Sequence, residues 1–132
     1  MVQDPLLQIL IVEDDPLVQD IVREALEDGG FQTQIVASGE AALALLNSGA
    51  TNYRALLTDV HLTGTVTGWD VAKRAREINP EIPIVYMTGD AADDWPSHGV
   101  PKSMLLNKPF APAQAVTAVS QLLNRAPGPS PE

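Results

Sequence analysis

Asp59 is the residue whose position in the sequence most clearly suggests chemistry. The preceding residues 55–58 (Ala-Leu-Leu-Thr) are mostly apolar and predict a buried strand that ends on this carboxylate. In an open parallel sheet, ligands bind in the crevice at the carboxyl ends of the strands. We therefore expect Asp59 to lie exposed at that edge, where a reaction could take place.

Three other short apolar stretches also end on residues that could do chemistry. These residues are two acids, a hydroxyl and an amine: Glu13 and Asp14 after 9–12, Thr88 after 84–87, and Lys108 after 104–107. If the strands are neighbours, the carboxylates of Glu13, Asp14 and Asp59 would repel one another, and a hard divalent cation would relieve this. Mg²⁺ suits such a set because it takes few carboxylates and keeps several waters, and Mn²⁺ could replace it.

This set predicts a phosphoryl acceptor. Asp14 and Asp59 are expected as direct metal ligands, Glu13 as a ligand through water, and the backbone carbonyl of His61 as a neutral ligand. A free oxygen of Asp59 could then attack phosphorus in line and form an acyl phosphate. The expected donors to the phosphoryl oxygens are Lys108, the Thr88 hydroxyl and the backbone N–H groups of Val60 and Gly89. Such a chain would catalyse its own phosphorylation and dephosphorylation, and we expect no separate substrate turnover.

The elements that position these residues alternate along the chain. Strands are predicted at 9–12, 32–36, 55–58, 83–87 and 103–107, and helices from 16 to 28, from 38 to about 47, at 69–78 and at 113–123. Residues 89–101, interrupted by Trp95-Pro96 and Gly99-Val100-Pro101, permit at most a short or distorted helix. This alternation predicts a flavodoxin-like, doubly wound α/β fold with a parallel sheet of order 2-1-3-4-5 and helices on both faces.

Length and composition limit the number of domains and the kinds of partner that the protein can have. The chain has 132 residues, 17 acidic against 8 basic, a formal charge of −9 and no cysteine. One domain is expected over 1–125, followed by a disordered, proline-rich tail at 126–132. The charge disfavours direct nucleic-acid binding, and neither a membrane span nor a signal peptide is apparent, so we expect a cytoplasmic protein without membrane contact.

Four motifs carry a resemblance to the receiver domains of two-component response regulators, notably the single-domain chemotaxis regulators. They are residues 11–15 (Ile-Val-Glu-Asp-Asp), 57–60 (Leu-Thr-Asp-Val), 87–89 (Met-Thr-Gly) and 107–110 (Asn-Lys-Pro-Phe), within a match from 8 to 123. The resemblance implies the following roles: Asp59 the phosphoacceptor, Glu13 and Asp14 the acidic pair, Thr88 the switch hydroxyl, and Lys108 the phosphate-binding lysine. It also implies a sensor histidine kinase or phosphotransfer protein as donor, and an unknown protein target at the surface of the fourth helix, fifth strand and fifth helix. A phosphorylation-dependent homodimer is a further expectation.

The sequence departs from the usual receiver pattern near the acceptor and on the fifth strand. Thr63 stands where a proline is usual, and residues 65–67 make this loop one residue longer. Leu105 stands where many members carry a switching Tyr or Phe, so the irregular segment 89–101 is the expected mobile element. His61 and Asp90 flank the acceptor and are expected to tune the lifetime of its phosphate.

The sequence leaves other interpretations open, among them a degenerate receiver that acts only as a docking module. A haloacid-dehalogenase-like phosphatase needs a second Asp two residues after its nucleophile, where this chain has His61, and places the nucleophile on the first strand. A flavodoxin-like nucleotide binder needs a glycine-rich loop after the first strand, where this chain has acids. The receiver could also be the C-terminal part of a hybrid histidine kinase, although we favour a stand-alone receiver.

Overall fold

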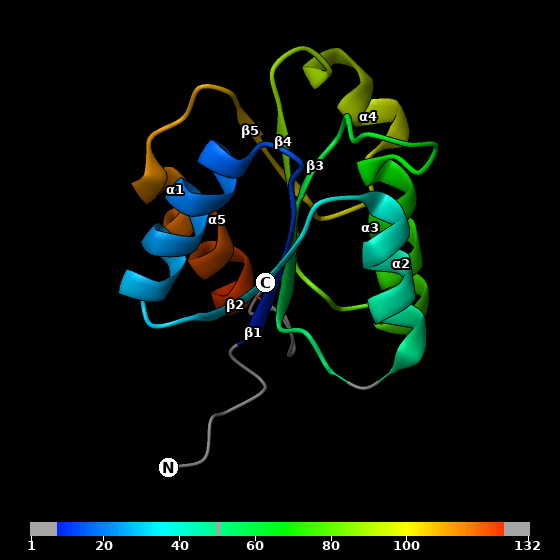
Figure 1. The fold of residues 1–132 in the computed structure, drawn as a ribbon, viewed down its shortest axis with the longest axis horizontal. Coiled ribbons are helices and arrows are strands. Elements are labelled where there is room, and N and C mark those ends of the chain that lie inside the picture. Colours follow the sequence, from blue (N-terminus) through cyan, green and yellow to red (C-terminus); the bar gives the residue numbers. More distant parts are fainter. Residues whose placement is uncertain (1–7, 50, 126–132) are drawn as a thin grey trace.

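A computed structural model describes residues 8–49 and 51–125 of the chain (Figure 1). Its sheet has five parallel strands: β1 (Gln8–Val12), β2 (Gln32–Val36), β3 (Ala55–Asp59), β4 (Ile84–Thr88) and β5 (Met104–Asn107). The strand order is β2-β1-β3-β4-β5, which confirms the predicted flavodoxin-like topology. In the register, Val12 pairs with Thr58 and Thr88 pairs with Asn107. The carboxyl ends of β1, β3, β4 and β5 are therefore level at one edge.

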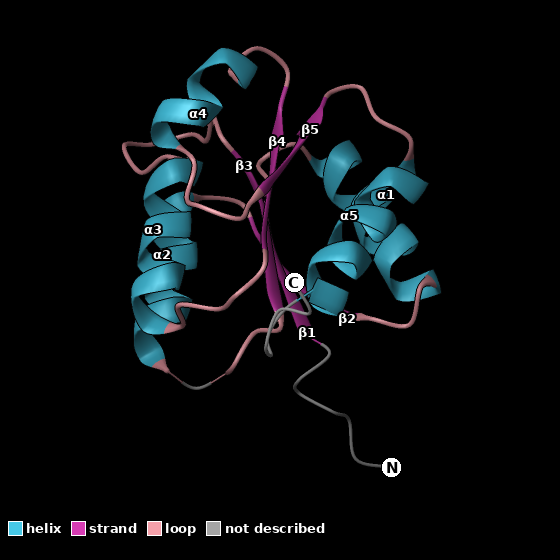
Figure 2. Ribbon diagram, turned by 180° about the vertical axis from the view of Figure 1, so that it is seen from behind, coloured by secondary structure: helices cyan, strands magenta, loops and turns pink. Residues whose placement is uncertain are grey.

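The helices form a layer on each face of the sheet. They are α1 (Pro16–Asp28), α2 (Gly39–Ser48), α3 (Gly68–Ile78), the one-turn α4 (Trp95–His98) and α5 (Pro112–Arg125), with a 3-10 turn, η2, at Ala92–Asp94. Helices α1 and α5 cover one face, and α2, α3 and α4 lie on the other (Figures 1 and 2). None of the helices in the described residues is long and apolar enough to cross a bilayer.

Side-chain caps fix where the helices begin. The Asp15 carboxylate accepts a hydrogen bond from the Leu17 N–H at the start of α1, and Ser38 does the same for the Ala41 N–H in α2. Thr67 and Asp70 form a reciprocal capping box at α3. Because Thr67 is the cap, α3 starts one residue before the predicted Trp69. The other element boundaries differ from prediction by at most two residues, and the tail at 126–132 lies outside the described residues.

The central strands are buried on both faces, as their unbroken apolar runs predicted. One core cluster lies under α1 and α5 and includes Ile11, Leu57 and Val85; the other lies under α2 and α3 and includes Leu56 and Tyr86. These residues are fully buried. Buried packing on both faces holds the strand ends in fixed relative positions, and those ends carry the candidate site.

Segment 89–101 contains only η2 and the single turn of α4, as the sequence predicted. The Tyr86 hydroxyl accepts a hydrogen bond from the Val100 N–H at 3.1 Å, and the Trp95 indole donates to Ser103 Oγ at 2.9 Å. The ring of Tyr86 also contacts that of Trp69, with centroids 4.6 Å apart. Leu105 is half-buried and packs against the same cluster. Tyr86 on β4 therefore supplies the aromatic ring in this part of the core, and its neighbour on β5 is the aliphatic Leu105.

Candidate functional site

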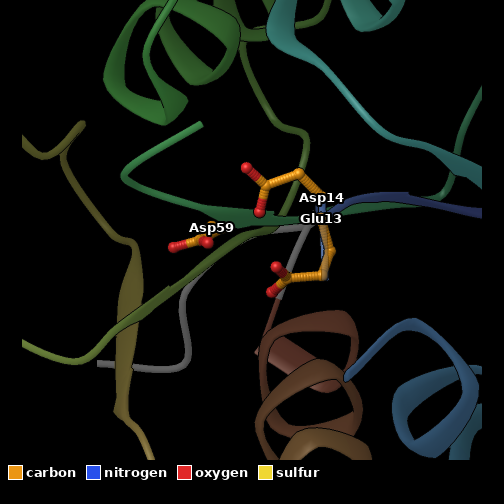
Figure 3. A group of neighbouring side chains, drawn as sticks. All are labelled: Glu13, Asp14 and Asp59. Carbon is orange, nitrogen blue, oxygen red and sulfur yellow. The ribbon is translucent and has the colours of Figure 1, made fainter. Parts of the chain in front are cut away.

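Three carboxylates meet at the carboxyl edge of the sheet (Figure 3). Glu13 and Asp14 follow β1, Asp59 ends β3, and one oxygen of each lies within 4.8 Å of those of the other two. Within the described residues this is the one cluster of acidic or histidine side chains that could hold a metal ion. The geometry agrees with the predicted grouping of these residues. Carboxylate oxygens are the ligands that hard divalent cations such as Mg²⁺ and Ca²⁺ take in proteins.

Asp59 is buried, which corrects the expectation that it would lie exposed. Its exposed fraction is 7%, and Glu13 is fully buried. The Asp59 carboxylate contacts Lys108 and the His61 N–H. The start of α3 packs on its backbone: the Gly68 N–H bonds to the Val60 carbonyl, and a side chain at Gly68 would collide with the Asp59 carbonyl. The low exposure of Asp59 strengthens the electrostatic interactions of its carboxylate.

Lys108 connects the two buried acids across the sheet. Its Nζ lies 2.9 Å from Glu13 Oε1 and 3.2 Å from Asp59 Oδ2. Burial raises the pKa of Glu13, and the bond from Lys108 offsets this only in part. Burial by itself would lower the pKa of Lys108, but the two carboxylates outweigh it and raise that pKa. One ammonium thus faces more negative charge than it balances, and the site retains an attraction for a further cation.

The Thr88 hydroxyl is buried at the end of β4 and holds the start of segment 89–101. Thr88 Oγ1 accepts hydrogen bonds from the Ala91 N–H at 2.8 Å and from the Asp90 N–H at 3.2 Å. Because both lone pairs of this oxygen are then used, its proton remains for donation.

The backbone donors at the site differ from those expected. The Val60 N–H bonds to the Met87 carbonyl at 3.0 Å within the sheet, so it is not free to serve a phosphoryl oxygen in this conformation. The next N–H, that of His61, points to the site and donates to Asp59 Oδ1 at 3.3 Å. A Cβ added at Gly89 would meet no atom within 4 Å, so its surroundings are open.

The side chains of His61 and Asp90 contact each other between the loops that follow β3 and β4. His61 Nε2 lies 3.0 Å from Asp90 Oδ1, and both side chains are largely exposed. The sequence predicted that both residues flank Asp59 but did not predict that they would contact each other.

Two further contacts near the site were not predicted from the sequence. Thr63 donates to Asp14 through both its N–H and its hydroxyl. The Tyr86 hydroxyl holds the Val100 N–H. The departure at Thr63 was visible in the sequence, but its contact with Asp14 was not, because the contact joins residues 49 positions apart.

The fold and the site define a class: a doubly wound α/β domain with an acidic strand-end cluster and a lysine that bridges two of its members. The model of the response regulator receiver domain family matches residues 9–120. The chain therefore belongs to this family and is a receiver domain of two-component signalling. This assignment excludes the phosphatase and nucleotide-binding alternatives.

Solved structures and curated proteins agree with this assignment. A response regulator receiver protein from Sinorhizobium medicae WSM419 is 45% identical, with a TM-score of 0.86 over 89% of this chain and 94% of that one. The receiver domain of sensor histidine kinase PA1611 from Pseudomonas aeruginosa PAO1, with magnesium coordinated in its active site cleft, is 25% identical, with a TM-score of 0.75 over 89% and 97%. Response regulator SaeR from Staphylococcus aureus is 25% identical over 89% of this chain and 50% of its own length. The chain spans about half the length of the curated relatives it matches.

Proposed function

We propose that Asp59 is the phosphoacceptor and receives its phosphoryl group from a sensor histidine kinase or a phosphotransfer protein in the cytosol. The observation that supports this most directly is the contact of Lys108 with both Asp59 and Glu13 beside Asp14. This arrangement brings a candidate nucleophile, a positive charge and a set of oxygen ligands together at the carboxyl edge of the sheet.

The proposed transfer forms a bond between an Asp59 oxygen and phosphorus while the bond from phosphorus to the donor breaks. Lys108 is within reach of Asp59 Oδ2 and would offset the charge on the transferred oxygens. Thr88 would contribute its hydroxyl proton, and the His61 and Gly89 N–H groups would act as backbone donors. Asp14, Asp59 and the His61 carbonyl would hold Mg²⁺, or Mn²⁺ in its place, with Glu13 bound through water. The metal would supply positive charge to the phosphoryl oxygens.

Thr88 provides the proposed route from the site to the surface. We propose that the Thr88 hydroxyl moves toward the phosphoryl group when it donates its proton, and that the Asp90 and Ala91 N–H groups then lose their acceptor. Segment 89–101 would rearrange in consequence, with Leu105 packing beside it. We propose that a protein target senses this change at the surface of α4, β5 and α5, and that a phosphorylation-dependent homodimer would use the same surface.

The test is phosphorylation by acetyl phosphate, followed by intact-protein mass spectrometry. We expect one phosphoryl group per chain in the presence of Mg²⁺ and none after chelation. Asp59→Asn should abolish the modification. Asp93→Asn, which removes the same charge from an exposed position, should leave it intact. Modification of the Asp59→Asn protein to the wild-type extent would refute the assignment.

A further inference from the structure

Thr63 holds the carboxylate of Asp14 with two donors. The Thr63 hydroxyl lies 2.8 Å from Asp14 Oδ2, and the Thr63 N–H lies 3.1 Å from the same oxygen. An aspartate oxygen has two lone pairs, so two hydrogen bonds use both of them. Any metal that also bound Oδ2 would have to displace one of these donors.

The loop that carries Thr63 is itself fastened to α2. Thr65 donates its N–H and its hydroxyl to Glu40 Oε2, at 3.1 and 3.3 Å. Gly64 lies between the two threonines with a φ of 104°, and a Cβ added there would come within 2.8 Å of the same Glu40 oxygen. Glycine is favoured at this positive φ, because a Cβ would strain the backbone there. The sequence Thr63-Gly64-Thr65 is therefore a turn that presents one threonine to Asp14 and the other to Glu40.

We infer that Thr63 is a positioning residue for the metal site and makes Asp14 a ligand through one oxygen. This inference rests on the proposed function, because it assumes that Asp14 binds the cation. A ligand limited to one oxygen suits Mg²⁺, which takes six ligands in a strict octahedron. Ca²⁺ accepts six to eight oxygens and often binds both oxygens of a carboxylate, so it gains less from such a ligand. Thr63 therefore favours the smaller ion.

Titration of the wild-type protein with Mg²⁺ and, separately, with Ca²⁺ tests this, with backbone amide chemical shifts as the readout. Thr63→Val removes the hydroxyl donor and keeps the shape. We expect it to weaken Mg²⁺ binding about ten-fold, the low end of the range for lost partners of metal ligands. Ca²⁺ binding should weaken less, because Oδ2 is freed for two-oxygen binding, and the preference for Mg²⁺ should fall. Thr63→Ser should restore wild-type values.

Thr33→Val is the matched control, because it removes a threonine hydroxyl bond to Glu27, an acid outside the metal cluster and away from the Thr63 loop. We expect its affinity for both ions to match that of the wild type. Equal affinities in Thr63→Val and wild type would overturn the inference. So would an equal loss for both ions, since general loosening of the loop would produce it. If the wild-type protein itself bound no Mg²⁺, the proposed function would fail at its metal site, which is a distinct result.

Discussion

Lys108 Nζ lies 2.9 Å from Glu13 Oε1, although 95 positions separate the two residues in the chain. Glu13 is fully buried, so its charge depends on this neighbour. Removal of one partner of a buried pair leaves the other charge uncompensated. Lys108 follows the last strand and Glu13 follows the first, so this pair couples the stability of the two ends of the chain's sheet.

Substitution of Lys108 should cost more stability when Glu13 is present than when it is neutral. We expect Lys108→Met to lower the free energy of unfolding by about 2 kcal/mol, less than for a fully buried pair because the lysine is partly exposed. In a Glu13→Gln background the cost should fall by about 1 kcal/mol. Urea denaturation of the four proteins without metal measures the difference, and equal costs in both backgrounds would show that the pair is not coupled.

Mg²⁺ should stabilise the folded protein, because the site brings three carboxylates together and has one ammonium to balance them. An excess of Mg²⁺ of about a hundred times its Kd should raise the free energy of unfolding by about 2.7 kcal/mol. Asp14→Asn should lose most of this gain, while Asp93→Asn should keep it. Urea titrations with and without Mg²⁺ give the values, and an equal gain in both variants would argue for unspecific charge screening.

The His61–Asp90 pair should limit the access of water to a phosphorylated Asp59. We expect His61→Ala and Asp90→Asn each to shorten the lifetime of the aspartyl phosphate several-fold, because either change separates the two loops. The pair is exposed, so stability should change by less than about 1 kcal/mol. Decay of phosphate from labelled protein measures the lifetime. Glu77→Gln, which breaks an exposed ion pair with Arg74 elsewhere, is the control, and its lifetime should be unchanged.

Two tyrosines should make the protein less stable in alkali. Burial raises the pKa of Tyr86 and of Tyr53 above the ordinary 10.0. Below pH 10 both are neutral whether the chain is folded or not, and the full stability is present. As the pH rises from there through the raised pKa values, the unfolded chain loses protons first and stability falls.

Phenylalanine variants separate the two contributions. Tyr86→Phe and Tyr53→Phe should each reduce the slope of stability against pH above 10, and the double variant should reduce it most. Part of the slope should remain, because the pKa of Lys108 is raised above its ordinary 10.5 as well. Tyr86→Phe should also cost about 1 kcal/mol at neutral pH, since the Val100 N–H loses its acceptor. An unchanged slope in both variants would show that the raised pKa values of the two tyrosines do not cause the loss of stability in alkali.

Gly68 should tolerate no side chain, because its Cα packs on the backbone of Asp59. We expect Gly68→Ala to lower the free energy of unfolding by about 2 kcal/mol and to slow phosphorylation of Asp59. Gly89→Ala is the matched control for stability, since a Cβ there meets nothing within 4 Å. Thermal unfolding compares the two, and equal melting temperatures would show that the start of α3 can move away from β3.

Much of this protein was determined by the sequence alone. Apolar runs at β1, β3 and β4, each followed by Glu13-Asp14, Asp59 or Thr88, predicted these strands and the residues at their ends. The alternation of strands and helices predicted the strand order. These signals are local. A buried parallel strand needs a continuous apolar run, and the polar residue that follows the run marks the end of the strand.

Tertiary structure decided what each polar group contacts. Three contacts join residues from different parts of the chain: the packing of Gly68 on the Asp59 backbone, the bonds from Thr63 to Asp14, and the bond from the Val60 N–H to the Met87 carbonyl. Hydrogen bonds need a donor and an acceptor within about 3 Å of each other, and a sequence does not state such distances between separate loops. The sequence therefore specified which chemical groups reach the carboxyl edge of the sheet, and packing determined which of them are already paired there.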